Sequence, residues 1–487
     1  MGIVADYYAL LNLPQDASNE EVRDAYFKAA RRYHPDANPD PLVRERFIQI
    51  QQAYEILSNP RQRSKYDLAL VESFILPDIS IDVKNSRSII PRFNEEQLFY
   101  SLIEIRCASK FEVTKRAPFF LCLVIDTSTS MSGKRLEMVK ANLINVMAEL
   151  NPDDKICLIS FNDRAEILLE PIQKSDVLNL DQYVHLLSPK GGTELYQGLL
   201  KGFRTILENG KSYISRHIIL MTDGHTYGDE QASIALSKEA EDHGVVINAF
   251  GFGDEWNDKF LDEITSNTGG NATYVRHSDD LKKYLEQKVQ VYGKLYANKI
   301  IYQFYKDPVV ELRYAFRIHP DITPLSCSDG LHFGNLQYNG NLKVFLEYAI
   351  RPLDSEKKSL RISSGRLKMN IANVEQEAEM FLKINLGVSE KRVSEAPPAS
   401  IVDAMSKLML YRMQEKAREE IKNGQISEGT KHLQHLATHL LSQGNRELAR
   451  AVLLEADHIN KNKSFSEEGD KRIKYATRSL LLPSSLE

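Results

Sequence analysis

Five oxygen-bearing side chains stand beside the ends of apolar segments in the middle of the chain. Asp126, Ser128 and Ser130 follow the apolar run FFLCLVID, Thr193 lies in SPKGGTELYQGL, and Asp223 follows the apolar run HIILMT. Carboxylate and hydroxyl oxygens are hard ligands that suit Mg²⁺ or Mn²⁺, and no cysteine or histidine is spaced to compete as in a zinc site. These five residues, called the cation set below, therefore predict a divalent cation site.

The charge balance of the cation set predicts how such a site would behave. Two carboxylates just balance a divalent ion, and three neutral hydroxyls leave the ion electrophilic with a coordination position open. An incoming carboxylate from another protein would bind strongly at that position. The competing interpretation is that the hydroxyls cap helices and that both aspartates merely end strands. Five such residues in one arrangement favour the cation site.

An enzyme interpretation starts from the same first aspartate. An aspartate after an apolar strand also begins the phosphoaspartate motif of haloacid-dehalogenase-like phosphatases, which needs a second acidic residue two positions later as general acid. Ser128 occupies that position after Asp126. The sequence also shows no Ser-His-Asp set and no P-loop, so a Mg-dependent phosphatase is the least favoured hypothesis.

A second group of residues, His34-Pro35-Asp36, stands between two stretches with helical periodicity. Ser18 and the acidic residues after it predict a capped helix start, and proline predicts that this helix ends before residue 35. A second helix is expected after Pro41, packed antiparallel on the first, so that the tripeptide is exposed at the joining loop. The apolar face of the first helix is predicted to consist of Val22, Tyr26, Phe27 and Ala30.

A resemblance to the J domain of the DnaJ family covers residues 5–67, with the sequence DYYALLNLPQDASNEEVRDAYFKAARRYHPD and then FIQIQQAYEILSNPRQRSKYD. It implies that the tripeptide contacts the seventy-kilodalton heat-shock chaperone and stimulates its ATP hydrolysis. It also implies that the basic end of the preceding helix docks electrostatically on that chaperone. Without the motif, the basic side chains at that end, Lys28, Arg31 and Arg32, would be interpreted as a solvated helix end that complements the helix macrodipole. The docking set is therefore His34, Pro35, Asp36, Lys28, Arg31 and Arg32.

Two details qualify this motif. Ala37 follows Asp36, where many members of the family have lysine. The tripeptide also recurs as His319-Pro320-Asp321, after strand-like alternation and without flanking helices. We interpret that second copy as a coincidence, a strand that ends at proline.

A second resemblance, to the von Willebrand factor type A domain, covers about residues 116–290. It rests on the DxSxS…T…D pattern of the cation set, on GGTEL, and on GFGDEWNDKFLDEITSNTGGNATYV. The resemblance implies a complete metal-ion-dependent adhesion site at Asp126, Ser128, Ser130, Thr193 and Asp223. In that site the hydroxyls bind the ion directly, the aspartates act directly or through water, and an acidic residue of a partner completes the shell.

Periodicity along the chain predicts the elements that hold both sets. Residues 1–70 show helical periods, and short strands of period two run from Ile79 to about residue 115. From Phe119, continuous apolar strands alternate with amphipathic helices, which predicts a doubly wound, Rossmann-like α/β sheet covered on both faces. In such a sheet, ligands bind beyond the carboxyl ends of the strands, where the cation set lies.

The remaining sequence predicts a β-sandwich-like domain and a helical one. Alternation returns between residues 300 and 390, and the β element at 72–115 is a candidate to join it. A charged linker with Pro397-Pro398 then leads into helices. We therefore predict a multidomain chain. Its parts are an all-α J domain (1–70), a β element (72–115), a von Willebrand factor type A domain (116–295), a β-sandwich-like domain (300–390) and a helical domain (399–482).

Composition excludes several classes of function. The 487 residues carry a net charge of −5 with both signs mixed, so neither nucleic acid nor an anionic membrane surface is an expected partner. The four cysteines lack CxxC spacing and are expected to be reduced core residues of a cytosolic protein. The chain starts without a basic and then apolar leader, and no stretch approaches 18 apolar residues, so we expect a cytoplasmic protein without membrane insertion.

Two weaker patterns lie in the C-terminal helices. His432, His435 and His439 share one helix face, but leucines fill the adjoining stripe, so the histidines are expected on the polar edge of a packed helix. The stripe Met405, Met409 and Met413 is expected in the core rather than in an adaptable groove.

Both sets together favour an adaptor rather than an enzyme. The hypothesis is a co-chaperone that delivers a heat-shock chaperone to a protein captured through Mg²⁺ or Mn²⁺. The alternative is a scaffold whose J domain no longer serves a chaperone and whose cation organises a complex. The sequence leaves open the client, the oligomeric state, the identity of the cation and the role of the C-terminal helices.

Overall fold

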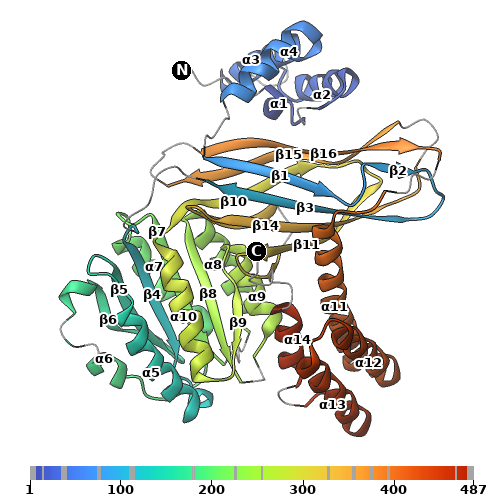
Figure 1. Ribbon diagram of the computed structural model, residues 1–487. Coiled ribbons are helices and arrows are strands. Elements are labelled where there is room, and N and C mark those ends of the chain that lie inside the picture. The colour runs from blue at the N-terminus through green and yellow to red at the C-terminus, as the bar shows by residue number, and fades with distance from the viewer. Residues whose placement is uncertain are drawn as a thin grey trace.

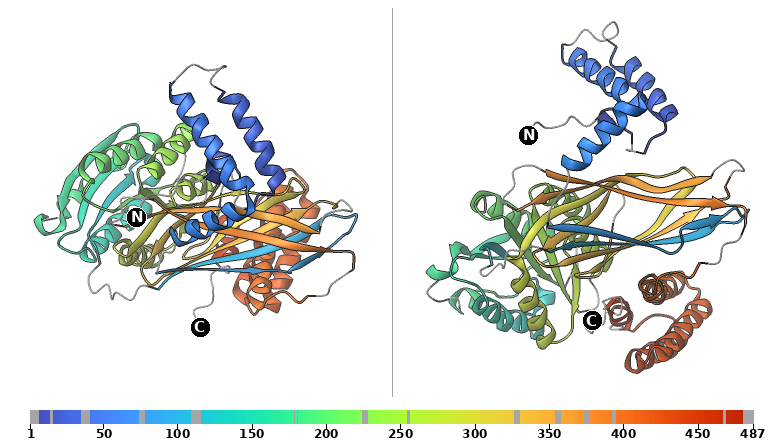
Figure 2. Two further views of the ribbon diagram at one scale, coloured as in Figure 1. Left: turned by 90° about the horizontal axis from the view of Figure 1, so that it is seen from above. Right: turned by 45° about the horizontal axis from the view of Figure 1, so that its top comes forward.

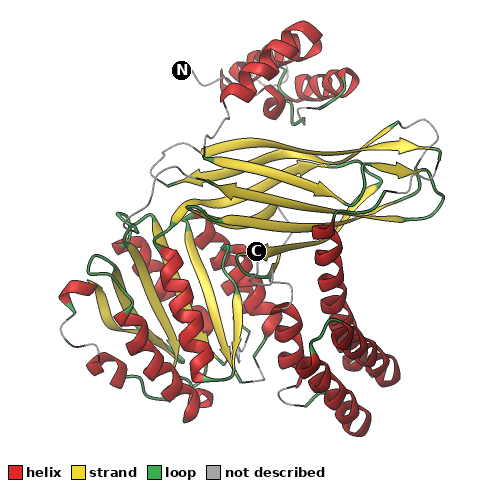
Figure 3. Ribbon diagram, viewed as in Figure 1, coloured by secondary structure: helices red, strands yellow, loops and turns green. Residues whose placement is uncertain are grey.

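The computed structural model describes residues 7–479 except 14–15, 35–40, 74–77, 109–115, 178, 180, 224–227, 254–255, 326–329, 354–357, 373–376, 392–394 and 467–468. These residues form an N-terminal helical unit, a β-sandwich, an α/β unit and a C-terminal helical unit (Figures 1 and 3). The predicted fold class is confirmed. None of the described helices combines the length and the apolar character needed to cross a bilayer.

The N-terminal unit is a helical hairpin of α2 (Asn19–Arg32) and α3 (Pro41–Ser58), with α1 (Tyr7–Leu10) before it and α4 (Pro60–Ser73) after it. The Ser18 hydroxyl caps α2 by accepting from the Glu21 amide, while the Glu21 carboxylate accepts from the Ser18 amide, as the sequence predicted. Val22 is buried against α3, and Tyr26 stacks on Tyr54 with ring centroids 4.2 Å apart.

One residue of the predicted apolar face of α2 was assigned wrongly. Phe27 is 52% exposed, because one residue beyond Tyr26 in a helix lies about 100° around the axis from it. Its ring therefore stands on the outer side of α2, one position before Lys28.

The β-sandwich combines strands that are far apart in the sequence. Within the described residues, one five-stranded sheet has the order β1-β3-β14-β11-β12 and the other has the order β13-β10-β15-β16-β2. The early strand β3 lies between β1 and β14, so the β element before residue 115 joins the later strands. The strands are β1 (Ile79–Asn85), β2 (Ile89–Pro91), β3 (Gln97–Cys107), β10 (Leu295–Tyr305), β11 (Val310–His319), β12 (Thr323–Pro324), β13 (Leu331–Gln337), β14 (Asn341–Ile350), β15 (Ser359–Ile371) and β16 (Glu377–Ser389).

The second His-Pro-Asp tripeptide lies at the end of β11. His319 is the last residue of that strand, and Asp321 pairs with Lys288 at 2.6 Å and with Arg317 at 2.9 Å. The prediction of a strand that ends at proline is confirmed. Through its ion pair with Lys288, Asp321 connects the sandwich to the α/β unit.

The α/β unit is inserted between β3 and β10. Its six-stranded sheet has the order β6-β5-β4-β7-β8-β9, in which only the β5–β6 pair is antiparallel among the described strands. The strands are β4 (Phe119–Asp126), β5 (Lys155–Phe161), β6 (Ala165–Gln173), β7 (Ser215–Thr222), β8 (Val245–Phe252) and β9 (Ala272–Val275). Helices cover both faces, which explains why every residue of β4 and β8 is buried.

The helices of this unit fall on two sides of the sheet. The α5 and α10 side chains pack on one face, and those of α7, α8 and α9 pack on the other. The helical segments are η1 (Thr129–Met131), α5 (Lys134–Ala148), η2 (Lys174–Asp176), α6 (Asp181–His185), α7 (Leu195–Asn209), α8 (Glu230–Asp242), α9 (Asp258–Asn267) and α10 (Ser278–Tyr292).

The C-terminal unit consists of α11 (Ala399–Lys422), α12 (Ile426–Ser442), α13 (Arg446–Asn462) and α14 (Gly469–Ser479). The first of these also packs on the sandwich, where Ile401 and Leu408 contact Phe316 and Phe345. The prediction that the methionine stripe lies in the core was wrong for Met409, which is 48% exposed, whereas Met405 and Met413 are partly buried against cores. Helical periodicity alone does not tell which other unit covers each side of α11.

The sandwich lies between the N-terminal unit and the other two units (Figure 1). Figure 2 shows the N-terminal helices over one face of the sandwich, with the α/β unit and the C-terminal helices on the other side. Cys107, Cys122 and Cys157 are buried, as expected, whereas Cys327 lies outside the described residues.

Candidate functional site

The described residues of the docking set lie at the basic end of α2 and just beyond it. Lys28, Arg31 and Arg32 are exposed on the last turns of α2, and the spacing of three and four residues from Lys28 puts them on one helix face. His34 is exposed just beyond, with its ring edge against Phe47 at a centroid distance of 5.5 Å. Pro35 and Asp36 lie outside the described residues. The structure thus brings four of the six predicted residues to one end of the helical hairpin.

The opposite end of α2 is held by the sandwich. Arg361 of β15 pairs with Asp16 at 3.1 Å and with Glu21 at 3.2 Å, and the Ser364 hydroxyl donates to Asp16 at 2.9 Å. Lys383 of β16 adds a longer ion pair of 3.5 Å to Asp16. Because the 14 residues of α2 span about 20 Å, this contact leaves the basic end well away from the sandwich.

Electrostatics favour this docked arrangement at neutral pH. Burial acts to raise the pKa of Asp16, but the hydrogen bond from Ser364 and the charges of Arg361 and Lys383 outweigh it and lower that pKa. The same balance of burial against Arg361 lowers the pKa of Glu21. Both carboxylates are therefore ionised and attached to the sheet at pH 7.

The cation set lies at the carboxyl edge of the α/β sheet. The neighbouring strands β4 and β7 are parallel, with Ile125 opposite Met221, so both deliver an aspartate to the same edge. Asp126 accepts from the Thr222 hydroxyl at 2.6 Å and from the Ser128 amide at 2.8 Å. The loop after β4 is thereby closed onto the end of β7.

The hydroxyl members of the set lie on two loops that contact each other. The Ser128 and Ser130 hydroxyl oxygens are 2.9 Å apart. Thr193 is buried and belongs to a loop that is bonded to the first loop, since the Lys190 amide donates to the Thr127 carbonyl at 2.7 Å. The structure therefore gathers both loops and both aspartates at one edge, with Ser130 exposed at its rim.

Two buried carboxylates at this edge lack full compensation by protein donors. Burial raises the pKa of Asp126 to about 6, and the charge of Asp223 adds to that effect against the hydrogen bonds from Thr222 and Ser128. The Oδ1 atom of Asp223 is buried and accepts no hydrogen bond from the residues that the structure describes. An unpaired buried carboxylate oxygen is costly. Hard oxygen donors around such an atom fit a divalent cation such as Mg²⁺.

Arg135 is a residue of this edge that sequence reasoning missed. It stands in the first turn of α5, and its Nη1 donates to Asp223 Oδ2 at 3.0 Å and to the Ser130 carbonyl at 3.1 Å. An arginine at the start of a helix looks like a solvated surface residue in sequence, and nothing in its spacing indicates Asp223 as a partner.

The three histidines of α12 behave as predicted. His435 and His439 are exposed, His432 bonds Glu420 at 2.7 Å, and the leucines of the adjoining stripe are buried. In the part of the chain that the structure describes, no group of three or more His, Cys, Asp or Glu side chains is arranged to hold a metal.

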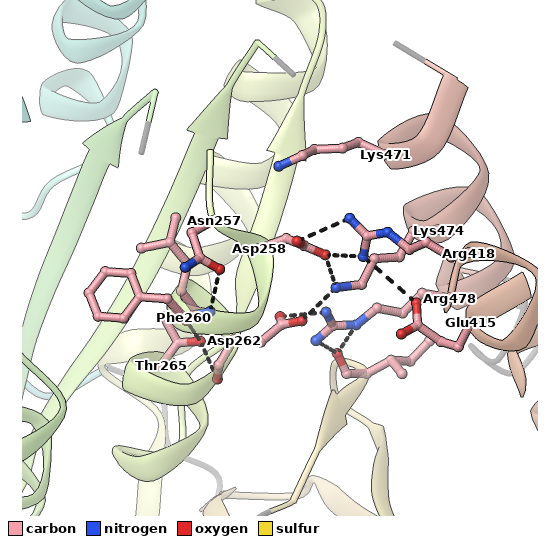
Figure 4. Close-up of polar contacts among 12 residues, drawn as sticks. Asn257, Asp258, Phe260, Asp262, Thr265, Glu415, Arg418, Lys471, Lys474 and Arg478 are labelled. Atoms are coloured by element: carbon pink, nitrogen blue, oxygen red, sulfur yellow. Dashed lines mark hydrogen bonds and ion pairs between the residues drawn. The ribbon is translucent and has the colours of Figure 1, made fainter. Parts of the chain in front are cut away.

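A buried ionic cluster, also missed from sequence, joins the α/β unit to the C-terminal helices. Figure 4 shows Asp258 and Asp262 of α9 facing Arg418 of α11 and Lys474 and Arg478 of α14. Arg418 lies 2.7 Å from Asp258, and Arg478 lies 2.6 Å from Asp262. Lys474 contacts both aspartates. The cluster fixes the C-terminal unit to the domain that carries the cation set.

Three family models match the chain in separate segments. Residues 6–67 match the DnaJ domain, residues 121–287 the von Willebrand factor type A domain, and residues 399–483 the Sll0103-like, C-terminal alpha-helical domain. The chain therefore contains a DnaJ domain and a von Willebrand factor type A domain, followed by a helical domain of the Sll0103 type.

Curated relatives resemble parts of the chain. The uncharacterized protein sll0103 of Synechocystis is 32% identical over 177 residues, which are 36% of this chain and 42% of that protein. Chaperone protein DnaJ 2 of Streptomyces avermitilis is 48% identical over 66 residues, 14% of this chain and 18% of that protein. The chain thus spans less than half the length of each of these relatives.

Solved structures resemble most of the chain in fold. A von Willebrand factor type A protein from Catenulispora acidiphila covers 82% of this chain and 96% of its own, with a TM-score of 0.64 and 14% identity. The ArnB paralog VWA2 from Sulfolobus acidocaldarius covers 84% of this chain and 100% of its own, with a TM-score of 0.50 and 15% identity. At these identities the likeness establishes the fold alone.

Proposed function

We propose that this protein is a co-chaperone adaptor. Its DnaJ domain recruits a seventy-kilodalton heat-shock chaperone through the docking set and stimulates ATP hydrolysis by that chaperone. Its von Willebrand factor type A domain binds a protein client or complex through Mg²⁺ or Mn²⁺ held by the cation set. An acidic residue of the client completes the coordination shell.

The observation that supports this proposal most directly is the buried Oδ1 of Asp223, which accepts no hydrogen bond within the described part of the chain. It lies beside Asp126 and next to the loops that carry Ser128, Ser130 and Thr193. A bound divalent ion would supply the positive charge that this buried oxygen lacks, and would offer its open position to a carboxylate. The residues of this chain hold and orient the ion.

The DnaJ domain supports the chaperone half of the proposal by its orientation. Asp16 and Glu21 attach one end of α2 to the sandwich, whereas the basic end and His34 remain exposed. A client bound at the cation set would raise the local chaperone concentration by tethering, to about millimolar for a short connection. We place this activity in the cytoplasm, where buried thiols such as those of Cys122 and Cys157 stay reduced.

Stimulation of the chaperone ATPase tests the chaperone half. The variant His34→Gln should lose the stimulation, while the chain contains its own matched control in the second tripeptide. The variant His319→Gln should stimulate as well as the unmodified protein, because that copy lies at the end of β11 without flanking helices. Undiminished stimulation by His34→Gln would leave a scaffold without chaperone activity as the better hypothesis.

Metal-dependent capture tests the client half. In pull-downs, a variant carrying Asp126→Ala and Ser128→Ala should lose prey that the unmodified protein captures, and a chelator should remove the same prey from the unmodified protein. Retention of all prey under both conditions would contradict the proposed role of the cation. Turnover of a generic phosphoester that Asp126→Asn abolishes would instead favour the phosphatase hypothesis.

A further inference from the structure

Arg135 occupies a position that is unfavourable for a positively charged side chain. The positive end of the helix dipole disfavours a basic side chain in the first turn of α5. Arg135 is nevertheless directed at the sheet edge by its bonds to Asp223 Oδ2 at 3.0 Å and to the Ser130 carbonyl at 3.1 Å. The Asp223 side chain is 1% exposed and that of Arg135 is 40% exposed. The guanidinium thus spans from the buried ligand to the solvent.

The turn after β8 leaves space for this guanidinium. Gly253 has φ of +72°, and a Cβ at this position would lie 2.4 Å from Arg135 Nη2. Any larger residue would displace the arginine, and the left-handed backbone here favours glycine as well. The end of β7, through Asp223, and the turn after β8, through Gly253, are therefore both compatible with Arg135 at this position.

The contact with Arg135 uses one carboxylate oxygen of Asp223 and leaves the other for the proposed metal ion. Oδ2 accepts from Arg135, whereas the buried Oδ1 accepts no hydrogen bond from any described residue and remains for the proposed metal ion. Both bonds of Arg135 to this edge use Nη1, so Nε and Nη2 keep N–H groups that can donate to a carboxylate. Arg135 orients Asp223 and is 40% exposed, so its remaining N–H groups can reach an acidic ligand at this edge.

Charge counting shows what Arg135 adds. The two aspartates of the cation set neutralise a divalent ion, and Arg135 then brings the loaded site to a net charge of about +1. A positive neighbour weakens binding of the metal cation and strengthens binding of an anion to the loaded site. Charge-assisted bonds from guanidinium to carboxylate add geometric selectivity.

We propose that Arg135 determines the ligand specificity of this site: it makes the loaded site select carboxylates and does so at the expense of metal affinity. This inference rests on the proposed cation site. In it, the client carboxylate that completes the metal shell also contacts Arg135.

Opposite changes in two affinities test the inference. Calorimetry with Mg²⁺ measures metal binding, and water-proton relaxation of the Mn²⁺-loaded protein measures glutarate binding through displacement of metal-bound water. Relative to the unmodified protein, Arg135→Gln should bind Mg²⁺ at least about threefold more tightly. It should bind glutarate about tenfold more weakly, since a hydrogen bond to a charged group is lost.

Lys134→Gln is the matched control, because it removes the same charge from the neighbouring exposed position of α5. It should change either affinity by less than about twofold, since screening weakens an exposed charge. Arg135→Lys keeps the charge but not the planar fork, so it should keep the metal affinity and lose part of the glutarate affinity. Thermal melts verify that every variant is folded.

The outcomes separate the inference from the proposed function. No heat with Mg²⁺ in the unmodified protein would remove the cation site and the inference together. Normal metal binding in the unmodified protein, with both affinities lowered in Arg135→Gln, would show that Arg135 only supports the fold of the edge. Unchanged affinities in Arg135→Gln, or equal effects of Lys134→Gln, would also overturn the inference.

Discussion

Removal of the Asp258 carboxylate should release α14 from the α/β unit. Asp258 accepts from Arg418 at 2.7 Å and 3.2 Å and also contacts Lys474 (Figure 4). Burial opposes ionisation of Asp258, but the hydrogen bond from Arg418 and the charge of Lys474 hold its pKa well below its usual range. The variant Asp258→Ala leaves both cations partly unpaired in a region where Lys474 is 2% exposed.

The loss of stability expected for Asp258→Ala depends on the partners that Arg418 and Lys474 retain. Removing one member of a buried ion pair costs about 3–5 kcal/mol. Arg418 keeps Asp470 at 2.6 Å, and Lys474 keeps Asp262 at 3.2 Å. We therefore expect the lower end, about 3 kcal/mol, which corresponds to about a hundredfold increase in the equilibrium constant for local opening.

Hydrogen exchange of the α14 amides measures this opening, because protection reports local unfolding. The control is Asp457→Ala on the exposed side of α13, which should leave exchange in α14 unchanged. Adding Lys474→Met to Asp258→Ala should restore part of the protection, since an apolar side chain avoids an unpaired buried charge. An increase of less than about threefold in Asp258→Ala would refute the view that this cluster holds the C-terminal unit in place.

Three further outcomes are expected. Arg361→Ala should weaken docking of the DnaJ domain on the sandwich by about 1 kcal/mol. Small-angle scattering should then show a more extended arrangement of the DnaJ domain and the sandwich. Unchanged scattering would contradict this. Because the pKa values of Asp16 and Glu21 are lowered on docking, their stabilisation is complete above the ordinary carboxylate range and is lost as pH falls below about 4; scattering that is constant from pH 7 to pH 3 would exclude this linkage. Gly253→Ala should displace Arg135 at a strain cost of about 1–2 kcal/mol and should mimic Arg135→Gln in metal and glutarate titrations, whereas wild-type affinities would show that the turn has no such role.

Local patterns made much of this protein predictable. The capped start of α2, the helix end before residue 35 and the aspartates that follow β4 and β7 depend on a few neighbouring residues. Alternation and apolar runs indicated the β-sandwich and the two-sided sheet, because burial on one face or two leaves a different periodicity in a strand. The segments that match the DnaJ and von Willebrand factor type A models are the ones with such dense local signals.

Other features could be decided only by the tertiary structure. The pairing of β3 with β14, the burial of Asp258 against Arg418 and Lys474, and the contact of Arg135 with Asp223 join residues that are far apart in the chain. Periodicity alone predicts that each of these charges is solvated, and it placed in a core Met409, which is 48% exposed. A sequence reports which face of an element is apolar or charged, but the partner of that face depends on how whole units pack together.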